Sequence, residues 1–278
     1  MGSGGSQKIF TTVKSYSKRG QLLKRSDLQT LAESRDLDEL VTRIKNTKYL
    51  DAINSVAKPY TAEKLEIALR AKLADEQFKI AKSSGNSKIL DAFFQRFIIS
   101  NLKLILKGKI LGKSQEEISA FFNMHAEELA KQRDIVVKAL VAKDLEEAVS
   151  SLGSSPFSDE IQKAVELYNE TKNIQAFDVY FDKMLYQNIT RALRSENDQD
   201  ISHIYGMETD FYNVMSIVRG KFWGLDDERI EDLTVGASVN IPNQVMDRMM
   251  AAENVKDALD ELSTTRYKDL VPETEDEV

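Results

Sequence analysis

The sequence predicts an all-α protein. In Lys88–Lys107 the apolar residues recur at steps of one, three and four, which places them in one stripe along a helix, and Ile174–Leu193 repeats this spacing. The 278 residues include only 4 prolines and 12 glycines, so long stretches can stay helical without interruption. No segment shows the alternation of apolar and polar residues that a half-buried strand needs. Helices alone are therefore expected.

Capping signals place the start of further helices. A small polar or acidic residue can accept hydrogen bonds from the free amide groups of a first helical turn, and a carboxylate in that turn favours the helix dipole. Such signals occur, in chain order, at Ser26-Asp27, Thr61, Ser114 and Asp226. We expect a long polar helix over Thr61–Lys82 and an apolar helix over Ile201–Phe222.

Glycines mark the expected helix ends. Glycine adopts positive φ without strain and so lets the chain leave a helix. Four glycines follow apolar segments in this way: Gly108, Gly112, Gly220 and Gly224. Outside the helical part, residues 1–7 are interpreted as a flexible leader and residues 271–278 as a disordered acidic tail.

Two motifs recur along the chain, which predicts an internal repeat. Asn101–Ile118 and Asn213–Ile230 are 112 residues apart and share the pattern [K/R]-G-K-x-x-G after an apolar helix. A second motif, an apolar helix followed by T-x-Y, occurs at Asp36–Tyr49 and Asn254–Tyr267, and in a weaker form at Asp144–Phe157. Two motifs with the same order and the same period indicate that each repeat has the same fold.

The glycine–lysine motif allows two interpretations. Lys107, Lys109 and Lys113 could bind phosphate, but the P-loop order of residues is absent and the second copy lies among carboxylates. The structural interpretation is a helix–helix corner, in which glycine ends the helix and a cation in its last turn favours the C-terminal dipole. We prefer the corner. Asn101 and Asn213, inside apolar helices, are expected to bond a neighbouring backbone across the repeat junction.

Composition argues against catalysis by thiols, histidines or metal ions. The chain has no cysteine, and its two histidines, His125 and His203, lie in no recognisable metal-binding or triad pattern. We interpret both as packing or surface residues and expect no catalytic residue, metal or cofactor. The net charge of −7 is divided unequally, because the first 113 residues are basic and the rest are strongly acidic.

The two motifs, in this order, resemble the C subunit of archaeal A-type ATP synthases, which is equivalent to the d subunit of eukaryotic V-type ATPases. That family also has an N-terminal Y-x-x-x-R-x-x-x-L-L signature. The sequence approaches it with Tyr16, Arg19 (one place early) and Leu22-Leu23. The resemblance extends over residues 8–270.

The resemblance implies three helical bundles around a pseudo-threefold axis, forming a funnel. It implies a non-catalytic rotor adaptor, bound peripherally at the cytoplasmic face of the cell membrane. The expected partners are the membrane proteolipid ring and the shaft of the D and F subunits, with no small-molecule substrate or nucleic acid. Matched corners would present matched charges to one face, so the candidate partner-binding residues are Lys107, Lys109, Arg219 and Lys221.

The expected domains follow the repeats. Residues 8–142 form repeat one, residues 143–252 form repeat two, and residues 253–270 begin a third, incomplete repeat. Two other function classes stay open. A nucleic-acid-binding helical repeat protein could use the basic first half, and its affinity would fall steeply with salt. An enzyme using carboxylates or a metal is the third possibility, although no suitable cluster stands out.

Overall fold

A computed structural model describes residues 3–85, 87–196, 199–236 and 238–271, and every regular element among them is a helix. The all-α prediction is confirmed. The chain divides into two compact units, Met1–Leu152 and Gly153–Val278, which we describe separately. The first unit ends at Leu152, whereas the first predicted repeat ends at residue 142. The boundaries of the repeats stay a prediction. Within the described ranges, no helix is both long and apolar enough to cross a lipid bilayer.

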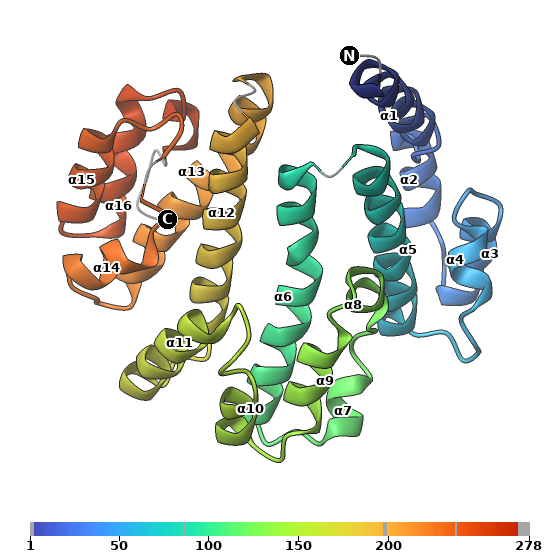
Figure 1. The fold of residues 1–278 in the computed structure, drawn as a ribbon, viewed down its shortest axis with the longest axis horizontal. Coiled ribbons are helices and arrows are strands. Elements are labelled where there is room, and N and C mark those ends of the chain that lie inside the picture. The colour runs from blue at the N-terminus through green and yellow to red at the C-terminus, as the bar shows by residue number, and fades with distance from the viewer. Residues whose placement is uncertain (1–2, 86, 197–198, 237, 272–278) are drawn as a thin grey trace. The chain divides into compact units, whose positions relative to one another are not determined.

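The first unit is built around two long antiparallel helices, α5 and α6 (Figure 1). The shorter helices α8, α9 and α10 pack beside them, and α1 packs on α5. The helices of this unit are α1 (Ser3–Arg19), α2 (Arg25–Ala32), α3 (Leu37–Lys45), α4 (Leu50–Asn54), α5 (Ala62–Ser83), α6 (Lys88–Ile110), α7 (Gln115–Ser119), α8 (His125–Ala130), α9 (Arg133–Val141) and α10 (Leu145–Ser151).

Helix α6 is the core element of the first unit. Its stripe residues Leu102, Ile105 and Leu106 have no exposed surface. Removing one such side chain from water stabilises a fold by about 1.5–3 kcal/mol. The helix begins where the Ser87 hydroxyl accepts the amide of Leu90, at 3.4 Å.

The second unit surrounds the apolar helix α13. Helix α12 packs between α11 and α13, while α14 and α16 contact α13 directly. The helices are α11 (Ser158–Thr171), α12 (Ala176–Glu196), α13 (Gln199–Phe222), α14 (Asp227–Leu233), α15 (Asn243–Ala251) and α16 (Val255–Asp260), followed by the 3-10 turns η1 (Glu261–Thr264) and η2 (Lys268–Leu270). One buried cluster joins α13, α14, α15, α16 and η1 and includes Ile217, Ile230, Met249, Ala258 and Leu262.

The long helices fall where the apolar periodicity predicts them. Helix α6 covers the predicted Lys88–Lys107 and continues to Ile110, while α12 and α13 agree within three residues at each end. Capping by Thr61, Ser114 and Asp226 is also confirmed, since each side chain accepts the amide three residues ahead.

Two local predictions are corrected. Helix α1 begins at Ser3, so the expected leader is helical from that residue onward. Helix α2 begins at Arg25, and Asp27 accepts the Lys24 amide at 2.8 Å, so Ser26 lies inside the first turn and does not cap it. Of the expected acidic tail, residues 272–278 lie outside the described part of the chain.

Candidate functional site

Both glycine–lysine motifs form the same helix-ending corner. At the first, Gly112 has φ +65°, its amide donates to Lys109 O at 3.1 Å, and the Lys113 amide donates to Gly108 O at 2.9 Å. These two bonds are the Schellman arrangement, which satisfies carbonyls that a helix end leaves free. The next helix starts at once, because Ser114 and Glu117 cap each other's amides at 2.8 and 3.1 Å.

The second corner repeats this geometry 112 residues later. Gly224 has φ +69°, its amide donates to Lys221 O at 3.0 Å, and the Leu225 amide donates to Gly220 O at 2.9 Å. Asp226 then accepts the Arg229 amide at 2.9 Å. The predicted helix ends at the second glycine of each motif are therefore confirmed.

The first glycine of each motif has a different role from the one predicted. Gly108 and Gly220 lie within α6 and α13 and do not end them. A Cβ atom on Gly108 would lie 2.7 Å from Ile118 Cγ1, and one on Gly220 would lie 2.5 Å from Ile230 Cγ1. Glycine is required there because the following short helix packs directly against the helix backbone.

The lysine between the glycines caps a different helix from its own. Lys109 Nζ donates to Leu140 O at 2.9 Å and to Ala142 O, at the C-terminal end of α9. Free carbonyls and the helix dipole make this end electronegative, so an ammonium group is favourable there. Lys109 is only 9% exposed, and these carbonyls compensate the burial of its charge.

Lys221 makes the same contacts in the second unit. Its Nζ donates to Met250 O at 2.7 Å and to Ala252 O, at the C-terminal end of α15. The corner thus fixes three helices: α13, which ends there, α14, which begins there, and α15, whose last turn is clamped. The sequence predicted a cation serving its own helix, and missed this contact because the acceptors lie 29 and 31 residues ahead.

These contacts separate the four predicted partner-binding residues into two kinds. Lys109 and Lys221 direct their ammonium groups at carbonyls of their own unit. Lys107 and Arg219 lie two residues earlier on the same helices and are half-buried. Any contact of Lys109 or Lys221 with a partner would compete with the clamp that each provides.

Exposed apolar side chains at the corners were not predicted. Leu111, next to the Schellman glycine of the first corner, is 65% exposed, and Phe222, at the end of α13, is 82% exposed. Large exposed apolar side chains next to cations are common features of interaction surfaces. Two apolar residues follow the lysine in both motifs, but the second of them is the exposed one at the first corner and the first of them at the second corner, so the sequence pattern alone does not identify the exposed residue.

Asn101, which is half-buried, and Asn213, which is buried, both bond the backbone, but within their own unit. Asn101 Nδ2 donates to Asn123 O at 3.0 Å and to Glu127 Oε1 at 2.7 Å. Asn213 Nδ2 donates to Val235 O at 3.0 Å, and its Oδ1 accepts the Val235 amide at 2.7 Å. The predicted hydrogen bond from each asparagine to a neighbouring backbone is confirmed. The prediction that it crosses the repeat junction is wrong, because both partners lie in the asparagine's own unit.

The three copies of the second motif share a local geometry. Asp36, Asp144 and Asn254 each accept the amide three residues ahead, at 2.8 to 2.9 Å. In the T-x-Y part, the hydroxyl accepts the amide of the aromatic residue two places on, at 3.1 to 3.2 Å in all three copies. In all three copies, the chain after the helix is therefore held by the same hydrogen bond, from the amide of the aromatic residue to the hydroxyl two residues earlier.

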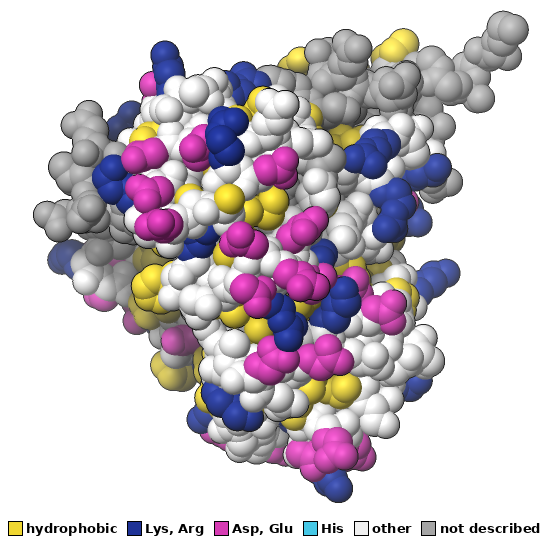
Figure 2. Space-filling model, turned by 90° about the vertical axis from the view of Figure 1, so that its left-hand side faces the viewer, with side chains coloured by type: hydrophobic (Ala, Val, Ile, Leu, Met, Phe, Trp, Pro, Cys, Tyr) yellow, Lys and Arg dark blue, Asp and Glu magenta, His cyan; other side chains and the backbone are white. Residues whose placement is uncertain are grey.

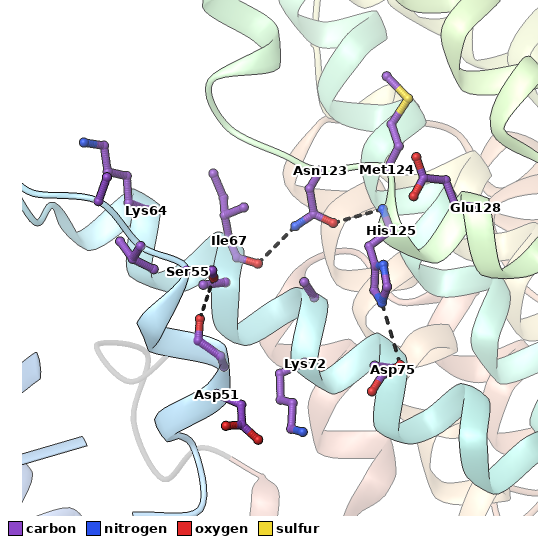
Figure 3. Close-up of a pocket in the computed structure, with 15 residues that line it drawn as sticks. Asp51, Ser55, Lys64, Ile67, Lys72, Asp75, Asn123, Met124, His125 and Glu128 are labelled. Atoms are coloured by element: carbon purple, nitrogen blue, oxygen red, sulfur yellow. Dashed lines mark hydrogen bonds and ion pairs between the residues drawn. The ribbon is translucent and has the colours of Figure 1, made fainter. Parts of the chain in front are cut away.

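A groove of about 820 Å³, lined by both apolar and charged side chains, lies in the first unit between α4, α5 and α8 (Figure 3). His125 points into it, with Nε2 3.8 Å from Asp75 Oδ1, and Lys72 lies on the same side. Ser55 donates to Ala52 O at 3.0 Å, away from the imidazole. Within the described residues, no three His, Asp or Glu side chains are grouped as a metal site would require. The side chain of His203 lies outside the described part.

Charges of both signs are mixed on the surface near α14, α15 and α16. Figure 2 shows acidic side chains spread over this face with basic ones between them, and apolar side chains only in small groups. A nucleic-acid interface needs a continuous basic surface to neutralise phosphates. The surface near α14, α15 and α16 does not provide one, whereas the basic first half on which the nucleic-acid alternative depends lies in the first unit.

Comparison with known proteins identifies relatives. The family described as "ATP synthase (C/AC39) subunit" matches residues 11–278. The C subunit of the A-type ATP synthase of Methanocaldococcus jannaschii is 26% identical over 280 aligned positions, which cover 96% of this chain and 68% of that protein. The corresponding C subunits of Thermococcus kodakarensis and Methanosphaera stadtmanae are 24% and 23% identical, over 92% and 94% of this chain and 68% and 67% of their own lengths.

Proposed function

Because the chain belongs to the ATP synthase (C/AC39) subunit family, we propose that it is a non-catalytic subunit of an A-type rotary ATP synthase. In finer terms, it is a central-stalk adaptor that seats the shaft of the D and F subunits on the membrane proteolipid ring. It transmits torque between ion transport and ATP synthesis, peripherally, at the cytoplasmic face of the membrane. The family match over residues 11–278 carries this proposal.

The corner geometry suits a part that transmits force. Torque passes through a protein only when its helices keep their relative positions under load. At each corner a glycine contact, a Schellman end and a lysine clamp fix one long helix and two short ones, as described for Gly108, Lys109 and Gly112. Hydrogen bonds to a charged donor contribute about 1.5–3 kcal/mol each when buried.

The corners also supply the proposed contacts with partners. Lys107 and Arg219 offer charge, and Leu111 and Phe222 offer exposed apolar surface beside them. Lys109 and Lys221 do not contact the partner in this proposal; they hold the corner in place through their hydrogen bonds to the ends of α9 and α15.

Binding assays on the whole 278-residue chain test the proposal. The immobilised proteolipid ring and the purified D–F shaft are each titrated with wild type and with two double variants, Lys107→Glu/Arg219→Glu and Leu111→Ser/Phe222→Ser. Each double variant is expected to weaken binding to at least one partner by about tenfold or more, the loss typical of removing central interface residues. Lys48→Glu, at an exposed lysine between α3 and α4 and away from the corners, is the control and is expected to bind as wild type. Unchanged binding of both double variants would exclude the corners as contacts, and no binding by wild type would refute the adaptor role.

A further inference from the structure

Helix α1 packs against the first unit with its polar side. Thr11 Oγ1 donates to Ser83 O, and Lys14 Nζ donates to Lys79 O at 3.0 Å. Lys18 Nζ lies 2.6 Å from a carboxylate oxygen of Glu76 on α5. These contacts orient α1 on the C-terminal half of α5, and Figure 1 shows α1 near the upper end of α5.

The opposite side of α1 is apolar and exposed. Ile9, Phe10, Val13 and Tyr16 follow helical spacing, so they lie along one side, and they are 59–68% exposed. An amphipathic helix of a globular unit normally turns this side inward, and Leu, Ile and Phe side chains gain about 1.5–3 kcal/mol each when it does. A helix that docks by its polar side and exposes its apolar side is arranged to bind something else.

The surroundings of this apolar side are basic. The segment from residue 8 to residue 25 holds four lysines and two arginines, and the first acidic residue of the chain is Asp27. Arg19, Lys24 and Arg25 are exposed, and so is Leu22 beside them. The partner that binds the apolar side of α1 is therefore expected to have an apolar interior and a negatively charged surface.

We propose that α1 and the following turn bind an anionic lipid surface. The apolar row inserts at the level of the headgroups, where Phe10 and Tyr16 suit the boundary between acyl chains and water. Arg19, Lys24 and Arg25 pair with lipid phosphates; residues 3–26 include no Asp or Glu, and the adjoining Asp27 carboxylate accepts the Lys24 amide at 2.8 Å. The contact anchors one edge of the first unit to the bilayer directly, in addition to any protein partner.

Sedimentation with lipid vesicles tests this contact. The whole chain is mixed with vesicles of equal parts phosphatidylglycerol and phosphatidylcholine, or of phosphatidylcholine alone. Wild type is expected to bind the anionic vesicles at least tenfold more tightly, and binding is expected to weaken as salt is raised. Phe10→Ser/Val13→Ser removes part of the apolar row, and Arg19→Glu/Lys24→Glu reverses the charge. Each is expected to reduce binding about tenfold or more.

Two controls and a depth measurement accompany the variants. Phe121→Ser, after α7, changes an apolar residue that is 58% exposed, about as exposed as Phe10, and is expected to bind as wild type. Phe10→Trp, made in a Trp223→Phe background, is expected to show fluorescence quenched by brominated lipid, since the ring would lie among acyl chains. All substituted positions on α1 are exposed, so these variants are expected to fold.

Several outcomes would overturn the proposal. Wild type that does not bind anionic vesicles excludes it, as does a serine variant that binds as well as wild type. A wild-type dimer that becomes monomeric in the serine variant, measured by light scattering, would assign the face to a second copy of the chain. If the serine variant loses binding to the immobilised proteolipid ring but keeps binding to vesicles, the apolar side of α1 would be assigned to a protein partner. The vesicles contain no protein, so this result is independent of the proposed adaptor function.

Discussion

Replacing Gly220 with alanine gives the sharpest test of how the corner is built. In the interior of an exposed helix, glycine to alanine stabilises a protein by about 0.5–1 kcal/mol, because alanine restricts the unfolded chain. At Gly220 the new Cβ would lie 2.5 Å from Ile230 Cγ1 and 3.2 Å from its Cδ1. Ile230 is fully buried in the main cluster of the second unit and cannot turn away without displacing its neighbours.

The expected net effect is therefore destabilising. Forcing a methyl group into a packed core costs about 1–3 kcal/mol, which exceeds the gain in helix propensity. We expect Gly220→Ala to lower the free energy of unfolding by about 0.5–2 kcal/mol. Urea unfolding followed by the fluorescence of Trp223, the only tryptophan and part of the same corner, measures this change.

A double variant and a control separate the clash from other causes. Ile230→Ala alone is expected to cost about 2–5 kcal/mol through its cavity, but Gly220→Ala added to it should cost nothing further, because the methyl group then fills space. Gly236→Ala, where a Cβ would meet nothing within 4 Å, serves as the matched control. Stabilisation by Gly220→Ala in the wild-type background would show that Gly220 is an ordinary helical glycine and would refute the packing argument.

Three further predictions concern buried polar groups, each measured by urea unfolding. Lys221→Met leaves the last carbonyls of α15 without their ammonium donor and is expected to cost about 1–3 kcal/mol; a change below about 0.5 kcal/mol would contradict the clamp. Burial raises the pKa of Glu127 above its ordinary 4.5, so the stability that it contributes is present below that pH and is lost as the pH rises through the raised pKa. Glu127→Gln is expected to remove that slope while Glu146→Gln, at an exposed site on α10, keeps it, and equal slopes in wild type and Glu127→Gln would refute the assignment. Tyr267→Phe removes the phenol that donates to the buried Asp210 carboxylate at 2.8 Å and is expected to cost about 1–2 kcal/mol. Burial beside Asp210 raises the pKa of Tyr267 to about 12, so wild type should show one tyrosine titrating there that is missing in the variant.

Local signals explain why much of the fold could be predicted. Helix α6 begins at a serine cap and ends at a positive-φ glycine, and both depend on residues within four positions along the chain. The roles of Gly108 and Lys109 could not be predicted in the same way, because Ile118 lies ten residues on and Leu140 lies 31 residues on. Such contacts depend on how the short helices α7 and α9 pack back onto α6, and the spacing of apolar residues along the sequence does not encode this packing.

The orientation of α1 shows the same limit. No helix was predicted over α1, and although its apolar residues have helical spacing, periodicity cannot say whether the apolar side faces a core or the outside. The polar contacts of Thr11, Lys14 and Lys18 with α5 decide this, and they join residues 58 to 72 positions apart. The candidate partner-binding residues were likewise chosen by repeat and charge and stay a prediction, while the contacts of Lys109 and Lys221 with the end of another helix needed the structure.

One bridging measurement tests the central claim most directly. The proteolipid ring is immobilised in detergent, the purified D–F shaft is added, and retention of the shaft is compared with and without the whole chain. The adaptor account predicts that the shaft is retained only when the chain is present, in proportion to the chain bound. Equal retention of the shaft without the chain, or a chain that binds neither the ring nor the shaft, would contradict the account.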